Sequence, residues 1–368
     1  MLLIETDRDT LLKPLQAVTG VVERRHTLPI LSNVLIERTE NTISFVATDL
    51  EMQITTFASC DDHQQSFAIT VAAKKLLDIC RALPEKAKIQ LEATDNRLQI
   101  KAGKSRFNLQ TLPAQDFPKI APPADIKTVV RLSQRTLKRC LNLVQYAMAQ
   151  QDIRYYLNGL LLVVDGTSLK VVATDGHRLS LASAELPQEQ TPQEVILPRK
   201  TILELVKLLG DSDEEVVIEI GQNQTKFTVA NTLLVSKVID GKFPDFTRVI
   251  PSSYEKHFVV PRILLQQTLQ RAAILSNEKF RGVRLVLTKD SLRVICNNNE
   301  QEEAQEEVEI SYDGAPLDVG FNVVYLLDVL NNLSVEQVDC AFGDANSSML
   351  VTIPGEAGFK YVVMPMRI

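Results

Sequence analysis

Six stretches of the chain carry apolar residues at spacings of three and four, the spacing of an amphipathic helix. They are residues 9–22, 72–83, 133–147, 198–209, 261–275 and 321–333. Between them lie short runs in which apolar and polar residues alternate, such as Leu98-Gln99-Ile100 and Phe107-Asn108-Leu109. Alternation of this kind is typical of half-buried antiparallel strands. The pattern predicts an α+β fold in which helices cover one face of antiparallel sheets.

The same order of elements occurs three times, which indicates three tandem copies of one unit. Ala47-Thr48-Asp49 returns as Ala173-Thr174-Asp175, and a looser third copy ends at Asn297-Asn298-Asn299. Pro122-Pro123 and Pro251-Ser252 supply the composition expected of linkers. We therefore expect three domains, at residues 1–124, 125–252 and 253–368.

Charge is unevenly distributed along the chain. The whole sequence has a net charge of −6, yet the six predicted helices hold twelve basic and four acidic residues. Helices that line a common surface would attract phosphate without reading base sequence, in a salt-dependent way. The alternative is that Lys and Arg are good helix formers on solvated faces. Charge alone leaves both interpretations open.

Several classes of protein are disfavoured. No apolar stretch of about 18 residues suggests a membrane span, and the start of the chain does not resemble a signal peptide. Five scattered cysteines without a CxxC pair fit a reducing cytoplasm and predict no metal site. No GxSxG, HExxH or Walker A motif is present. Asp175 and His177 are therefore interpreted as part of a structural turn, and we expect neither catalysis nor a cofactor.

Five long motifs resemble the bacterial DNA sliding clamp family, the beta subunit of DNA polymerase III. They are residues 151–159, 173–179, 240–246, 275–285 and 361–368. The resemblance covers the whole chain and implies three DNA-clamp domains in a head-to-tail homodimer that closes as a ring. It implies a non-catalytic protein that encircles double-stranded DNA. Its partners would be the polymerase alpha subunit, the clamp loader, other polymerases and repair proteins, which would bind through short peptide motifs.

The resemblance also implies a peptide-binding pocket between the second and third domains. Its predicted wall comprises Leu157, Thr174, Gly176, His177, Arg178, Leu179, Pro244, Arg248, Val249, Asn322, Tyr325 and Ser348, and it is closed by Val362, Val363, Met364, Pro365, Met366 and Arg367. Two methionines that flank a proline make a soft apolar surface for varied peptides. The alternative is that these last residues form a core strand, although Pro365 is awkward inside a central strand.

Four residues are implied to contact DNA: Arg25, Gln151, Tyr155 and Tyr156. Arginine would meet phosphate, and the tyrosines would pack on sugars or bases. The alternative for the two tyrosines is a place in the core. The segment before Arg25 is not the glycine-rich form associated with the family, so the sequence leaves open which arginine faces DNA.

The dimer contact has an argument from charge. Residues 300–307 form an acidic run, in which Glu300, Glu302 and Glu303 would face basic residues of a second copy. The predicted interface also includes Lys75, Lys104, Arg106, Phe107, Leu109, Ile274 and Leu275. The alternative for this acidic run is a solvated segment.

For the whole chain, the alternative function is a chromosomal DNA-binding structural protein without ring topology, which would remain on linear DNA.

Overall fold

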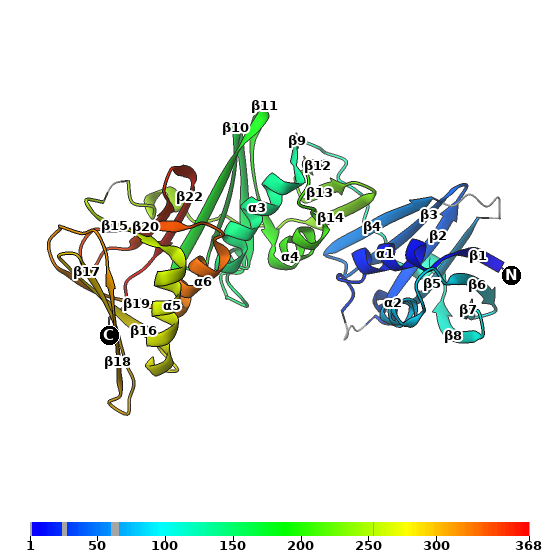
Figure 1. The fold of residues 1–368 in the computed structure, drawn as a ribbon. Coiled ribbons are helices and arrows are strands. Elements are labelled where there is room, and N and C mark those ends of the chain that lie inside the picture. The colour runs from blue at the N-terminus through cyan, green and yellow to red at the C-terminus, as the bar shows by residue number, and fades with distance from the viewer. Residues whose placement is uncertain (1, 24–27, 60–65, 253, 368) are drawn as a thin grey trace. The chain divides into compact units, whose positions relative to one another are not determined.

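The chain folds into two compact units. The computed structural model describes residues 2–23, 28–59, 66–252 and 254–367 (Figure 1). One unit comprises Met1–Leu137 with Lys200–Val238, and the other comprises Lys138–Arg199 with Ile239–Ile368. This division runs through the middle copy of the sequence repeat, so each unit contains one junction between successive copies.

The first unit is built on a twelve-stranded antiparallel sheet, in the order β1-β6-β7-β8-β5-β2-β3-β4-β14-β13-β12-β9. The strands are β1 Leu2–Asp7, β2 Asn33–Thr39, β3 Thr42–Thr48, β4 Met52–Ser59, β5 Phe67–Ala72, β6 Lys88–Thr94, β7 Arg97–Ala102, β8 Ser105–Leu112, β9 Thr128–Ser133, β12 Glu215–Ile220, β13 Gln224–Val229 and β14 Thr232–Lys237. The first and second copies meet where β4 pairs with β14, from Thr56 opposite Thr232 to Met52 opposite Ser236.

Helices α1 (Arg8–Val18) and α2 (Ala73–Ala82) lie side by side in this unit (Figure 1). Each buries one apolar stripe, with Leu11 and Leu15 on α1 and Leu76 on α2. The spacing of these buried residues is that of a helix face turned to a core. Helix α4 (Arg199–Leu208) buries Ile202 and Leu205 in the same way.

The second unit contains a six-stranded sheet, β10-β11-β22-β21-β20-β15, and a four-stranded sheet, β18-β17-β16-β19. The strands are β10 Gly159–Thr174, β11 Arg178–Pro198, β15 Lys256–Pro261, β16 Gly282–Thr288, β17 Ser291–Asn297, β18 Glu303–Glu309, β19 Leu317–Asn322, β20 Gln337–Phe342, β21 Met349–Ile353 and β22 Glu356–Val363. The second and third copies meet where β11 pairs with β22, from Arg178 opposite Val363 to Ala182 opposite Phe359.

All six predicted helices are present. The remaining three are α3 (Gln134–Val144), α5 (Arg262–Ala272) and α6 (Val323–Asn332). Helices α3 and α5 are each followed by one turn of 3₁₀ helix, η3 (Gln145–Ala147) and η6 (Ala273–Leu275). The other 3₁₀ turns are η1 Pro29–Ser32, η2 Ala114–Asp116, η4 Tyr155–Leu157 and η5 Phe246–Arg248. The predicted α+β class is therefore confirmed, with helix ends that differ by a few residues.

Candidate functional site

The second unit contains a pocket with a volume of about 200 Å³. Ten residues predicted for the peptide-binding wall meet there, although they come from four separate segments. The lining comprises Arg154, Tyr156, Leu157, Thr174, Gly176, His177, Arg178, Leu179, Phe243, Pro244, Phe246, Val249, Val362 and Met364. Part of the lining also belongs to a buried apolar cluster, namely Leu157, Leu179, Phe243 and Val362. The pocket therefore lies directly against the core of the unit.

A tight turn between β10 and β11 forms one wall of the pocket. The Thr174 hydroxyl donates to the carbonyl of Arg178 over 2.5 Å and accepts from the amide of Gly176 over 3.1 Å. Gly176 has a φ of +90°, a region that favours glycine. A Cβ there would lie 2.8 Å from Nη1 of Arg154. Gly176 therefore allows both the turn and the close approach of a guanidinium.

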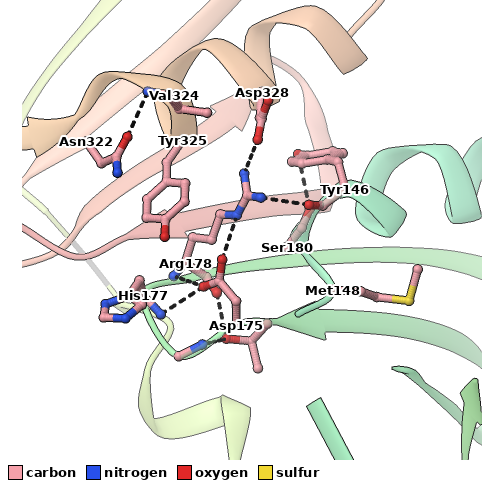
Figure 2. A network of polar contacts seen from close by, with 12 residues as sticks. Tyr146, Met148, Asp175, His177, Arg178, Ser180, Asn322, Val324, Tyr325 and Asp328 are labelled. Carbon is pink, nitrogen blue, oxygen red and sulfur yellow. Dashed lines mark hydrogen bonds and ion pairs between the residues drawn. The ribbon is translucent and has the colours of Figure 1, made fainter. Parts of the chain in front are cut away.

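Arg178 ties this turn to the third copy of the repeat, as Figure 2 shows. Its guanidinium donates to Oδ2 of Asp175 over 3.1 Å, to Oδ2 of Asp328 over 2.5 Å and to the carbonyl of Tyr146 over 2.8 Å. It also lies 4.5 Å from the centre of the Tyr325 ring, within range of a cation–π contact. Only 9% of the Arg178 side chain is exposed. Its pKa is nevertheless raised, because neighbouring groups that include Asp328 and Asp175 outweigh burial, which lowers it.

The other predicted wall residues lie outside the lining. Tyr325 stacks on His177 at 6.5 Å between ring centres. The Asn322 side chain caps α6 by accepting from the amide of Val324 over 2.9 Å. The Ser348 carbonyl accepts from the Tyr254 hydroxyl, and the exposed Arg248 pairs with Asp245. Tyr325 thus packs against the lining residue His177, and Asn322 caps the helix that carries Tyr325.

The C-terminal segment changes character within a few residues. Val362 and Val363 are buried on β22, and of the two only Val362 lines the pocket. Met364 is 45% exposed, and its amide donates to the carbonyl of His177 over 2.9 Å. Beyond Pro365, the amide of Met366 donates to Gly320 over 2.8 Å, while Arg367 is exposed. The segment is therefore a core strand up to Val363 and pocket rim at Met364.

Four lining residues were not predicted for the wall: Arg154, Tyr156, Phe243 and Phe246. Phe243 and Phe246 flank the predicted Pro244, so the apolar character of that motif was the available signal. Arg154 points to the pocket because it forms two hydrogen bonds with the Asp152 carboxylate and one with the carbonyl of Asp175. Hydrogen bonds from Arg154 lower the pKa of Asp152 to about 2.

The residues predicted to contact DNA are divided. Gln151 and Tyr155 are exposed, and Ile153 between them is 96% exposed. Tyr156 instead lines the pocket, with its ring edge-on to Tyr155 at 5.8 Å. Arg25 lies outside the described residues. Residues 151–156 therefore present exposed side chains on one side and pocket side chains on the other.

The helices are basic in the structure as well, with thirteen basic and four acidic residues within their observed bounds. Several of these cations already have internal partners. Arg199 donates to the carbonyl of Met148, and Arg262 donates to the carbonyls of Leu330 and Val335. Further ion pairs join Arg135 to Asp213, Arg139 to Glu356 and Arg271 to Glu306. The charge count therefore overstates the number of cations left for phosphate.

The predicted dimer residues lie on or near two strands, β8 and β18. Strand β8 pairs with β5 only at Thr111 and Leu112, so among the described residues its first part pairs on one side only, with β7. On β8, Arg106 is exposed, whereas Phe107 and Leu109 are half-buried. Strand β18 is the last strand of its sheet and includes the exposed Glu303. Around these strands, Lys75, Lys104, Glu300 and Glu302 are exposed, Ile274 is 77% exposed and Leu275 is half-buried. Each unit thus contributes one charged edge with apolar side chains beside it.

Neither a metal cluster nor a catalytic pair is assembled in the part of the chain that the structure describes. No three His, Cys, Asp or Glu side chains among these residues gather as a metal ion would require. Asp175 holds backbone amides and Arg178, and so is not placed as a proton partner for His177. Within the described ranges, no helix is long and apolar enough to cross a membrane.

Comparison with known proteins gives a consistent result along the chain. Models of the DNA polymerase III beta subunit match its N-terminal domain at residues 2–121, its central domain at 131–245 and its C-terminal domain at 247–367. The beta sliding clamp of Pseudomonas putida is 48% identical over 362 residues, which cover 98% of each chain.

Solved structures agree with the sequence comparison. A DNA polymerase sliding clamp from Pseudomonas aeruginosa, crystallised with a ligand, matches with a TM-score of 0.95 and 46% identity over 100% of both chains. The Caulobacter crescentus beta sliding clamp, with polyethylene glycol in what is described as its beta-motif tethering region, matches with a TM-score of 0.91 and 39% identity. That match covers 99% of this chain and 98% of the other. The chain therefore belongs to the family of bacterial DNA polymerase III beta sliding clamps, non-catalytic processivity factors with three clamp domains.

Proposed function

We propose that two copies of this chain close head to tail as a ring around double-stranded DNA and tether replication and repair proteins through the pocket. The observation that carries the proposal is the way in which successive copies of the repeat are joined. Gln53 on β4 opposes Val235 on β14, and Leu179 on β11 opposes Val362 on β22. Both junctions are antiparallel strand pairs, and they use corresponding strands of successive copies.

A third junction of the same kind has no partner within one chain. The strand of the third copy that corresponds to β4 and β11 is β18, and the strand of the first copy that corresponds to β14 and β22 is β8. By analogy with the β4–β14 register, Glu303 would lie opposite Asn108 and Ala304 opposite Phe107 of a second copy. Acidic β18 would then meet basic β8, and both exposed sheet edges would be covered. Two copies related by rotation satisfy both edges and close the assembly.

The pocket supports the second part of the proposal. Most of its lining residues are apolar, and the lining also includes Arg154, His177 and Arg178. Such a site suits a short extended peptide with apolar anchors, and Met364 on the rim can adapt to different side chains. The replicative polymerase alpha subunit, the clamp loader and other polymerases would then compete for one groove.

DNA would be held by topology and by phosphate contacts that carry no sequence information. Gln151 and Tyr155 support this role because they are exposed. We retain residues 1–124, 125–252 and 253–368 as the proposed domains, and the cytoplasm, where such DNA lies, as the proposed location.

Retention on DNA of different topology tests the function. The protein would be loaded onto singly nicked circular DNA with a clamp loader and ATP, and separated from free protein by gel filtration. A ring should stay on the circle and be lost when a restriction enzyme linearises it. Retention on the linear product would instead favour a chromosomal DNA-binding protein that grips DNA directly.

A further inference from the structure

Lys200, in the first turn of α4, makes three internal contacts with the first copy of the repeat. Its ammonium group donates to the carbonyl of Val21 over 3.0 Å, to Oε1 of Glu23 over 2.8 Å and to Oδ2 of Asp49 over 2.5 Å. An ammonium group has three donors, so all of them are in use. Lys200 is one of the twelve basic residues of the predicted helices, for which phosphate binding was one of two interpretations, and its contacts indicate a different role.

The carboxylate of Asp49 is built to receive this cation. Its Oδ1 accepts the backbone amides of Glu51 and Met52, over 3.0 and 2.8 Å, and so shapes the turn before β4. Its Oδ2 remains for Lys200. The Asp49 side chain is only 8% exposed, so the ion pair is partly shielded from water. Charge pairs of this kind hold their geometry better than exposed ones do.

A second side chain of α4 grips the same segment one turn later. A Cβ on Gly20 would lie 1.8 Å from Oε2 of Glu204, so the buried carboxylate packs directly on the glycine backbone. Lys200 and Glu204 are four residues apart and share one face of the helix. Residues 19–23 are thus held by α4 at both ends, immediately before Arg24 and Arg25 in the sequence.

We propose that Lys200 is a positioning residue for DNA retention, which fixes residues 19–23 and the Asp49 turn to α4 and does not itself bind phosphate. The inference rests on the proposed ring function and adds a residue to it. Loss of the ammonium group would release the segment that leads to the predicted DNA-contacting arginine. Loss of the Asp49 carboxylate would do the same, although it changes the net charge in the opposite direction.

Two substitutions that change the net charge in opposite directions distinguish a positioning role of Lys200 from a direct phosphate contact. Lys200→Met keeps the aliphatic stem and removes the donors, whereas Asp49→Asn keeps the oxygen that shapes the turn and removes the ion pair. Both variants would be loaded on singly nicked circular DNA, and their dissociation half-lives compared with that of the wild type. We expect both half-lives to fall by roughly three- to tenfold, and the double variant to be no worse than either single one.

A direct phosphate contact gives a different result, because Asp49→Asn would then free Lys200 and lengthen the half-life. That outcome, or unchanged half-lives in both variants, would overturn the proposal. Lys237→Met is the matched control, since Lys237 pairs with the exposed Glu51 beside the same turn and should not affect retention. Lys200→Arg should restore most of the half-life. Melting curves and solution mass would verify that the variants fold and dimerise, and failure of the wild type to stay on circles would overturn the ring function as well.

Discussion

Asp49 and Asp175 hold two copies of the same turn, one at each internal junction of the chain. In both, Oδ1 accepts the backbone amides two and three residues later, and Oδ2 accepts a cation. The residue after each aspartate has a positive φ, +76° at Leu50 and +90° at Gly176. Because leucine occupies the first of these positions, backbone conformation alone does not require the glycine in the second turn.

Gly176→Ala tests whether close packing explains that glycine. The added Cβ would push against the Arg154 guanidinium and deform the pocket wall. We expect a loss of stability of about 1–2 kcal/mol from the left-handed backbone, together with weaker binding of a peptide derived from the polymerase. Gly355→Ala is the matched control, since Gly355 has a φ of +79° with open space around its missing Cβ. It should cost similar stability and leave peptide affinity unchanged, as measured by fluorescence anisotropy.

Arg178→Met should destabilise the second unit. The substitution leaves the partly buried carboxylates of Asp175 and Asp328 without their shared cation. We expect a cost between the value of about 0–1 kcal/mol for a surface pair and the value of about 3–5 kcal/mol for a fully buried one. Thermal unfolding followed by circular dichroism would show the loss. Arg248→Met provides the contrast, because the Arg248 side chain is 85% exposed and surface pairs contribute about 0–1 kcal/mol. Equal shifts in the two variants would contradict this account of the network.

Removal of the last five residues, from Met364 onward, should abolish peptide binding and leave the dimer. The cut falls after Val363, so strand β22 keeps its pairing with β11 while the pocket rim is lost. Isothermal titration with a polymerase peptide measures the first effect, and light scattering measures the second. Undiminished affinity would remove the C-terminal segment from the proposed site.

Substitution of Ile274 by Ala and Leu275 by Asp should produce monomers. These side chains lie beside the free β18 edge, and a buried aspartate would have no partner there. Sedimentation would report the mass. Ile153→Asp is the control for a general effect of exposed apolar residues, since Ile153 is 96% exposed but lies on no sheet edge. A double variant that still dimerises would place the interface elsewhere.

The sequence predicted the fold well because each copy of the repeat has the same local pattern of apolar and polar residues. Apolar spacing located all six helices, and the Ala-Thr-Asp copies located equivalent turns. The pocket was predicted through the resemblance to a known family. The roles of the residues around it were harder to predict from the sequence. Asn322 caps its own helix, whereas the stacking of Tyr325 on His177 depends on the approach of the second and third copies.

Side-chain direction was the main feature that the sequence left open. Tyr155 and Tyr156 are neighbouring residues of the same type, but Tyr155 is exposed and Tyr156 lines the pocket. Lys200 and Arg199 counted as helix cations, yet backbone carbonyls take up part of their hydrogen bonding. A backbone carbonyl from a distant segment can accept a hydrogen bond whatever its residue type, so the sequence does not predict which cations it will bind.

Strand β18 and the first part of β8, which are the two proposed dimer edges, differ in charge, with exposed Glu303 on the first and exposed Arg106 on the second. In the proposed ring, two copies would therefore join with a single polarity, and a half-turn about the axis of the DNA would interchange them. Such a rotation would carry each pocket to an equivalent point at the same height along that axis. Every docked protein would consequently approach from one side, so that the ring gives the machinery travelling with it a front and a back.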